Sequence, residues 1–185
     1  GETSEVLLSN ADAAMYHAKA RGRNNFQYFS SEMNQQAAER LEMENSLRTA
    51  ILNEEFVLHY QPQVDLNSGQ IRGLEALIRW NHPHKGMMSP GRFMPILEES
   101  GMIITVGEWV LDQACKDLRG WLDMDLPEVR MAVNLSGHQF TGVNLTHSVK
   151  RVLDRYQLNP SFLDLEITET VLMKDVAARV IESRW

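Results

Sequence analysis

The second half of the sequence alternates between segments with helix periodicity and segments with strand periodicity, and this alternation limits the possible folds. From Arg79 onward the order is helix, strand, helix, strand, helix. Helical patterns cover about 91–100, 106–122 and 145–156, strand patterns cover 131–135 and 163–168, and a last helical pattern starts after that. Such alternation is typical of parallel βα units, in which each helix returns the chain to the same end of the sheet. We therefore expect an α/β fold with a parallel sheet.

A β-hairpin is predicted just before these units. The residues from Phe56 to Gln61 have strand periodicity. Asn67-Ser68-Gly69 supplies turn-forming residues before a second strand at 71–80.

The first 53 residues are predicted to be mainly helical. A first amphipathic helix has apolar residues at spacings of three and four: Leu7, Ala11, Ala14, Met15 and Ala18. Gly22 ends this helix, and the aromatic residues of 26–29 suggest a short strand. Ser30 or Ser31 then caps a long charged helix that runs to about Asn53, which we interpret as a connector.

Composition limits the partners and the compartment. The formal net charge of -7 argues against a surface for DNA or RNA, which relies on clustered Lys and Arg. The single cysteine, Cys115, excludes an internal disulfide and favours a reducing, cytoplasmic location, and its apolar neighbours predict an inert, buried thiol. No apolar run reaches the roughly 18 residues of a membrane helix, so any membrane anchor is expected upstream in a longer parent protein.

Three residues with side-chain oxygens occupy predicted strands. They are Glu75, Asn134 and Glu166. The ends of parallel strands meet at one face of a βα barrel, so these side chains are expected to converge there, facing a largely buried interior. Two carboxylates and an amide oxygen are hard ligands that suit Mg²⁺ or Mn²⁺. Alternatively, Asn134 makes a turn-like bond and the glutamates pair with nearby arginines.

Six separated strings occur in the order and rough spacing of EAL domains. They are Tyr60-Gln61-Pro62, Glu75-Ala76-Leu77-Ile78-Arg79-Trp80, Ser89-Pro90-Gly91-Arg92-Phe93-Met94-Pro95, Gly107-Glu108-Trp109-Val110-Leu111, Ala132-Val133-Asn134-Leu135-Ser136 and Leu165-Glu166-Ile167-Thr168-Glu169. The chain thus resembles EAL domains from about residue 55 to 175. Upstream, Ala11-Asp12-Ala13-Ala14-Met15-Tyr16 and Ala18-Lys19-Ala20-Arg21-Gly22-Arg23-Asn24 resemble the last helix of a GGDEF, or diguanylate cyclase, domain.

The resemblance implies a modified TIM barrel that hydrolyses cyclic-di-GMP to pGpG with two divalent metal ions, Mg²⁺ or Mn²⁺. By position, Glu75, Asn134 and Glu166 match the family's metal ligands, and Glu75 is expected to be catalytic. Gln61 and Arg79 match the residues that contact the substrate. Arg79 suits that role because a guanidinium grips phosphate oxygens with two parallel bonds.

The cyclase part is expected to be a remnant. Lys19 and Arg23 match phosphate-contacting positions of the cyclase family, but the Gly-Gly-Asp-Glu-Phe hairpin is absent from the chain. We therefore expect no cyclase activity from this chain, and we expect the two cations to be exposed charges at a helix end.

The EAL resemblance stops after 181–183, before the family's Asp-Asp-Phe-Gly-Thr-Gly segment and catalytic Lys strand. A TIM barrel needs about 250 residues, so the expected fold is a partial (βα) barrel. We expect a GGDEF tail at 1–29, a connector helix at 30–53 and the N-terminal half of an EAL domain at 54–185. The parent is expected to be a phosphodiesterase with upstream sensor domains, and this chain is expected to be inactive alone. The exposed sheet edge or the EAL domain would support a homodimer. The alternatives are a cyclic-di-GMP receptor without catalysis and a gene remnant.

Overall fold

The computed structural model describes residues 3–20, 24–124, 129–140 and 145–167. The chain divides into two compact units, Gly1–Leu47 and Arg48–Trp185, and each is considered by itself. None of the helices in these described ranges is both long and apolar enough to cross a membrane.

The first unit contains the helix α1 (Ser4–Ala20) and most of α2 (Ser31–Leu52), as the sequence predicts. Asn34 Nδ2 donates to Asn10 Oδ1 at 3.3 Å, which links the two helices. The strand predicted at 26–29 is wrong. Phe26 and Tyr28 are 74% and 84% exposed, and no strand among the described residues pairs with this segment. Aromatic residues favour strands only where a partner strand satisfies the backbone, which is lacking here.

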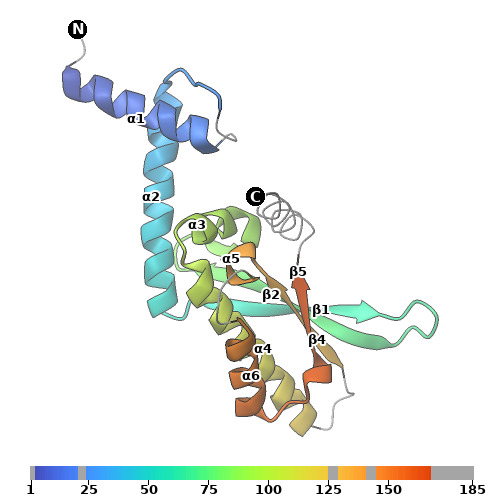
Figure 1. Cartoon of the computed structure of the whole chain (residues 1–185). Coiled ribbons are helices and arrows are strands. Elements are labelled where there is room, and N and C mark those ends of the chain that lie inside the picture. The colour runs from blue at the N-terminus through green and yellow to red at the C-terminus, as the bar shows by residue number, and fades with distance from the viewer. Residues whose placement is uncertain (1–2, 21–23, 125–128, 141–144, 168–185) are drawn as a thin grey trace, which may run out of the picture. The chain divides into compact units, whose positions relative to one another are not determined.

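The second unit contains one mixed sheet (Figure 1). Its strands are β1 (Phe56–Val64), β2 (Ile71–His82), β3 (Gly86–Met88), β4 (Arg130–Leu135) and β5 (Leu163–Ile167). The order is β1-β2-β4-β5, with β3 also paired to β2. β1 and β3 run antiparallel to β2, whereas β2, β4 and β5 are parallel neighbours. The predicted hairpin and the predicted parallel pairing of the last two strands are therefore confirmed.

The short strand β3 was not predicted. The residues around it, with Pro83 and Gly86, favoured a loop. Gly86 adopts a φ of 68°, which glycine tolerates at a tight reversal, and His82 Nδ1 accepts hydrogen bonds from the backbone N–H groups of His84 and Lys85. This turn returns the chain beside β2.

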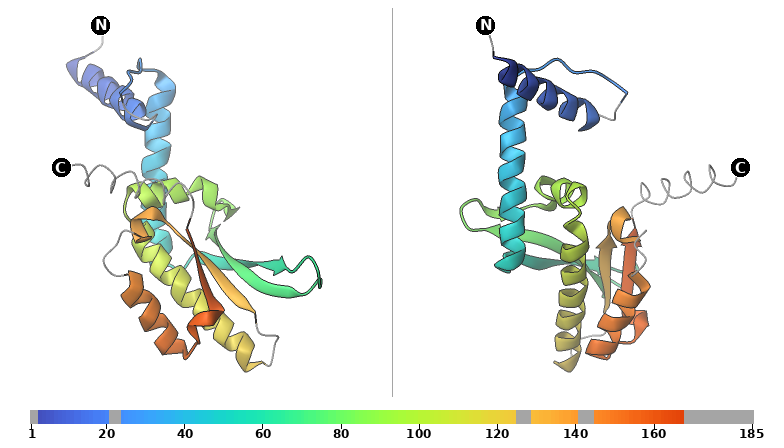
Figure 2. Two further views of the ribbon diagram at one scale, coloured as in Figure 1. Left: turned by 45° about the vertical axis from the view of Figure 1, so that its right-hand side comes forward. Right: turned by 60° about the vertical axis from the view of Figure 1, so that its left-hand side comes forward.

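Helices cover one face of the sheet (Figure 2). α4 (Ile103–Asp123) lies on this face with α6 (Leu145–Tyr156) beside it. The other helical elements are the 3₁₀ turn η1 (Pro90–Arg92), α3 (Met94–Glu99), α5 (Gly137–Phe140) and a second 3₁₀ turn, η2 (Pro160–Phe162), which precedes β5. α4 packs on β1, β2 and β4 and lies against α6. Asp112 of α4 joins these helices, since it accepts from Arg155 Nη1 at 2.6 Å and from the Tyr156 hydroxyl at 2.8 Å.

The core lies between these helices and the sheet. Its most deeply buried side chains in the second unit are Trp80, Phe93, Met88, Leu97, Leu118, Met131, Val133 and Cys115. Cys115 is buried as predicted, and burial, followed by the nearby charge of Asp112, raises the pKa of its thiol to about 12. A thiol with that pKa is protonated at neutral pH, so Cys115 is not a reactive nucleophile.

The polar and apolar side chains of β4 lie on different faces of the sheet. In β4, Met131, Val133 and Leu135 point to the helices and are buried, whereas Asn134, between them, points to the other face and is exposed. On the same face Ala132 is buried and Glu75 and Glu166 are half-buried, so the expected buried interior is found only in part. The polar side chains of Glu75, Asn134 and Glu166 are therefore at least partly accessible to water.

Candidate functional site

Glu75 and Asn134 are in direct contact on the open face of the sheet. Glu75 lies in β2 and pairs in register with Ala132 of β4, and Asn134 lies two residues further along β4. Asn134 Nδ2 donates to Glu75 Oε1 at 2.7 Å. Because the amide nitrogen makes this bond, the amide oxygen of Asn134 and the second carboxylate oxygen of Glu75 remain as acceptors for another group.

Glu166 completes a row of three oxygen-bearing side chains. It pairs in register with Asn134 across β4 and β5, so the two side chains lie next to each other on the same face. Gln63 Nε2 of β1 donates to Glu166 Oε1 at 3.4 Å. Neither Glu75 nor Glu166 is fully buried. The sequence therefore located all three residues correctly on one face of parallel strands.

Gln61 and Arg79 lie on the same face. Gln61 is directly opposite Glu75 in the antiparallel β1–β2 pair and is exposed. Arg79 follows Glu75 by four residues in β2 and is half-buried, and its Nη1 donates to the Ile78 carbonyl at 2.8 Å. A guanidinium has five N–H donors, so this one bond leaves donors for an anionic ligand.

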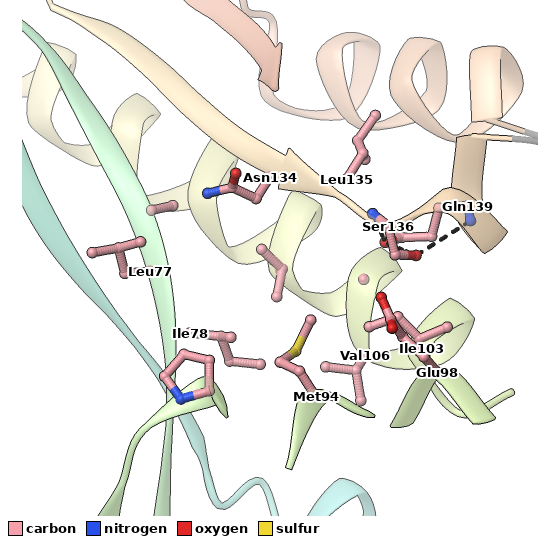
Figure 3. A pocket seen from close by; sticks show the side chains of 14 residues that line it. Leu77, Ile78, Met94, Glu98, Ile103, Val106, Asn134, Leu135, Ser136 and Gln139 are labelled. Atoms are coloured by element: carbon pink, nitrogen blue, oxygen red, sulfur yellow. Dashed lines mark hydrogen bonds between the residues drawn. The ribbon is translucent and has the colours of Figure 1, made fainter. Parts of the chain in front are cut away.

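A pocket of about 260 Å³ lies beside Asn134 (Figure 3). It is lined mainly by apolar residues, together with a few polar ones: Ala76, Leu77, Ile78, Pro90, Met94, Glu98, Ile103, Val106, Gly107, Val110, Asn134, Leu135, Ser136 and Gln139. Apolar walls with a few polar groups are typical of sites for small organic ligands.

The pocket wall is fixed by a capping box at the start of α5. Gln139 Oε1 accepts from the Ser136 N–H at 3.1 Å, and the Gln139 N–H donates to Ser136 Oγ at 3.3 Å. The Gln139 side chain lies so close to Gly107 that an added Cβ would be 1.8 Å from Gln139 Nε2. Sequence reasoning missed this element, although Ser-x-x-Gln after a strand is a recognisable capping signal.

Tyr60 anchors β1 on the opposite, helix-covered face. Its hydroxyl donates to Asp117 Oδ2 at 2.5 Å, and its ring makes an edge contact with Trp121 at 4.8 Å between centroids. Gln113 Nε2 donates to the second oxygen of Asp117 at 2.8 Å. Burial, and then the hydrogen bond and charge of Asp117, raise the pKa of Tyr60 far above its usual value. Tyr60 therefore fixes the strand position next to Gln61.

The donor set on the open face is suited to a hard cation. In the described part of the chain, no three His, Cys, Asp or Glu residues are grouped so that they could hold a metal ion. The row consists instead of two carboxylates and one amide. Oxygen donors of this kind favour Mg²⁺ or Mn²⁺ over Zn²⁺, and their partial exposure leaves room for water molecules on the ion.

The predicted remnant cyclase contacts, Lys19 and Arg23, belong to the first part of the sequence. Lys19 is exposed on α1 in the first unit. Arg23 lies outside the described residues.

The chain is thus an α/β protein whose mixed sheet bears a polar site, with acidic and amide side chains on parallel strands of one face. The family model for the EAL domain matches residues 44–183, and the chain belongs to this family.

Two proteins of Pseudomonas aeruginosa are similar to nearly the whole of this chain. The chain is 47% identical over 181 residues to the bifunctional diguanylate cyclase/cyclic di-GMP phosphodiesterase MucR of Pseudomonas aeruginosa, covering 98% of this chain and 26% of MucR. It is 40% identical over 176 residues to the cyclic di-GMP phosphodiesterase NbdA of the same organism, covering 95% of this chain and 22% of NbdA. The chain thus spans about a quarter of the length of these relatives.

A solved structure, described as the PaMucR phosphodiesterase in complex with c-di-GMP, resembles this fold with a TM-score of 0.71. The identity is 44%, and the match covers 76% of this chain and 57% of the PaMucR chain.

Proposed function

We propose that this chain is the N-terminal part of an EAL phosphodiesterase domain, whose parent protein hydrolyses cyclic-di-GMP to pGpG. The single observation that carries the proposal is the contact between Asn134 and Glu75, with Glu166 in register beside Asn134. The names of MucR and NbdA, and the c-di-GMP in the PaMucR structure, support the choice of substrate.

In this proposal Glu75, Asn134 and Glu166 hold divalent metal ions, Mg²⁺ or Mn²⁺, and Glu75 is the catalytic ligand. Bound there, such ions would supply Lewis acidity for activating water and for neutralising charge on the phosphate. The hydrogen bond from Asn134 orients the Glu75 carboxylate. Its Oε1 accepts from the Asn134 amide, and its other oxygen can bind a metal ion. Orienting a ligand in advance lowers the cost of binding the ion.

Gln61 and Arg79 contact the substrate in this proposal. Arg79 supplies a planar fork of N–H donors to a phosphate, and Gln61, opposite Glu75, supplies neutral donors and acceptors. The pocket beside Asn134 extends to the helix-covered side of the sheet, because Ala76 and Ile78 alternate with Glu75 and Arg79 along β2 and face α4.

The proposed architecture is a GGDEF tail at 1–29, a connector helix at 30–53 and a partial TIM-type barrel from 54 onward. Sensor domains lie upstream in the parent, and the domain works in the cytoplasm, where a buried free thiol such as Cys115 is stable. The chain forms homodimers through its EAL domain or the exposed sheet edge. Alone, it has little or no turnover, because three ligands on one side make an incomplete site.

The experiment is a cyclic-di-GMP hydrolysis assay with Mg²⁺ or Mn²⁺, carried out on this chain and on the parent protein. The chain should give no pGpG above background, whereas the parent should give pGpG. In the parent, Glu75→Ala should remove most activity, while Asp123→Asn should not, because Asp123 is an exposed surface carboxylate paired with Arg119. Tight nucleotide binding without turnover by the parent would instead identify a receptor, and absence of both would refute the proposal.

A further inference from the structure

We propose that Gln63 is a positioning residue for Glu166, because its side-chain amide holds the Glu166 carboxylate beside Asn134. The significance of this contact for metal binding rests on the proposed function, in which Glu166 is a metal ligand. The contact itself is independent of that assignment.

The hydrogen bond connects two distant parts of the sheet. Gln63 lies in β1 and Glu166 in β5, with β2 and β4 between them, and the residues are 103 positions apart in the sequence. Gln63 Nε2 donates to Glu166 Oε1 at 3.4 Å, which occupies one carboxylate oxygen and leaves the other free. Holding a flexible Glu side chain in one orientation costs conformational entropy, and the Gln63 amide supplies an interaction that offsets part of it.

Gly73 provides the space that this bond requires. Gly73 is directly opposite Gln63 in the β1–β2 pair. A Cβ on Gly73 would lie 2.8 Å from Gln63 Oε1 and 3.2 Å from the Arg130 carbonyl oxygen. The φ angle of Gly73 is not in the left-handed region, so the backbone does not require a glycine there. Glycine inside a strand weakens the strand and often marks a close approach, which here is the approach of the Gln63 amide.

A β-bulge follows Gln63 immediately. Gln63 is opposite Gly73, but Val64 is opposite Ile71, so Arg72 is an extra residue in β2. Bulges increase the local twist and redirect neighbouring side chains, and they are frequent next to active sites. The bulge therefore lies directly beside Gln63, where it increases the local twist of the hairpin.

The expected consequence is a better ordered ligand. Residues that hydrogen-bond to metal ligands typically change metal affinity by about 10- to 100-fold when they are removed. The Gln63–Glu166 bond is long and accessible to water, so we expect the lower end of that range. Substitution of Gln63 should therefore weaken Mn²⁺ binding by about 10-fold.

The contact can be tested without any metal by NMR of the 185-residue chain in EDTA. The side-chain NH₂ signals of Gln63, assigned by their loss in Gln63→Ala, should move when Glu166→Gln removes the negative charge. The signals of Gln61 form the internal control, because Gln61 is on the same strand but opposite Glu75. An unchanged Gln63 signal in Glu166→Gln would overturn the proposal.

Mn²⁺ titration of the same chain tests the consequence. Gln63→Ala should weaken binding about 10-fold, whereas Gln70→Ala, at an exposed glutamine of the same hairpin, should not. Gly73→Ala should also weaken binding in the unmodified chain, and it should weaken binding less in Gln63→Ala, where only the contact of the new Cβ with the Arg130 carbonyl remains. Equal affinity of Gln63→Ala and the unmodified chain, or simple additivity with Gly73→Ala, would overturn the positioning role. If the unmodified chain bound no Mn²⁺, the three residues would not hold a metal ion in this chain alone, and the NMR signals would still show whether Gln63 contacts Glu166.

Discussion

Asn134 and Glu75 are joined by a hydrogen bond of 2.7 Å between adjacent parallel strands, although they are 59 positions apart in the sequence. The donor is a neutral amide, so it orients the carboxylate without adding a second charge beside it. A carboxylate in place of Asn134 would face Glu75 as a like charge, with Glu166 on its other side. An amide at the centre of the row therefore allows three oxygen-bearing side chains to lie together before any cation is present.

The first prediction concerns Asn134→Asp. With metal removed by EDTA, this variant should have a lower Tm than the unmodified chain, because like charges at this distance repel. Addition of Mn²⁺ should raise its Tm by more than it raises that of the unmodified chain, since the extra charge also attracts the ion. Thermal unfolding followed by circular dichroism with and without Mn²⁺ measures both effects. Equal Tm values in EDTA would contradict the interpretation of the Asn134–Glu75 contact.

A second prediction concerns the anchor on the opposite face. Tyr60→Phe keeps the ring contact with Trp121 but removes the hydroxyl that donates to Asp117. Hydrogen bonds to charged groups contribute about 1.5–3 kcal/mol, and partial exposure reduces this, so we expect a loss of about 1 kcal/mol in the free energy of unfolding. Urea unfolding should show a lower midpoint with an unchanged slope. A midpoint equal to that of the unmodified chain would show that the hydroxyl contributes nothing.

The periodicity of the sequence was sufficient to predict the hairpin and the parallel pairing of β4 with β5, because strand alternation and helical crossovers are local signals. It failed at 26–29, where aromatic residues favoured a strand but no described strand pairs with them. It also missed β3, because a three-residue strand has no periodicity of its own and depends on its pairing with β2.

The candidate site was predictable in its residues but not in its surroundings. Matching strings indicated Glu75, Asn134 and Glu166, and the register of parallel strands brought them together. The exposure of Asn134 was not predictable, because it depends on what covers the face and not on the strand itself. The contact of Gln63 with Glu166 links residues 103 positions apart, and no local pattern encodes such a distance.

The third prediction concerns the hairpin turn and pH. Asp65 Oδ1 accepts hydrogen bonds from the Ser68 N–H at 2.8 Å, the Ser68 hydroxyl at 2.9 Å and the Asn67 N–H at 3.1 Å. The Ser68 backbone bond, followed by its hydroxyl, lowers the pKa of Asp65 in the folded chain. A lowered pKa stabilises the fold above the unfolded value of about 3.9 and loses that contribution as the pH falls through the folded value.

Asp65→Ala should therefore lower the Tm at pH 7, and the difference from the unmodified chain should shrink below about pH 4. Asp65→Asn is the matched control, because it keeps an acceptor oxygen without a titrating group. Its Tm difference from the unmodified chain should also narrow at low pH, but from a smaller starting value. A Tm difference for Asp65→Ala that is constant from pH 7 to pH 3 would exclude the ionised carboxylate as the stabilising group.

The last prediction concerns Arg79 and the distinction between its charge and its geometry. Arg79 is half-buried in β2, on the face that bears Glu75, and its bond to the Ile78 carbonyl fixes one end of the guanidinium. A fixed planar fork can make two parallel bonds to a phosphate, whereas a lysine offers a mobile point charge.

If Arg79 binds the phosphate of cyclic-di-GMP in this way, Arg79→Lys should lose most of the affinity that Arg79→Ala loses. Calorimetric titration of the parent protein with the dinucleotide, in EDTA so that no metal ion supports turnover, compares the two variants. Arg72→Lys is the control, because Arg72 is an exposed arginine near the start of the same strand. Near-normal affinity of Arg79→Lys together with weak binding by Arg79→Ala would show that charge alone matters, and normal binding by both would remove Arg79 from the site.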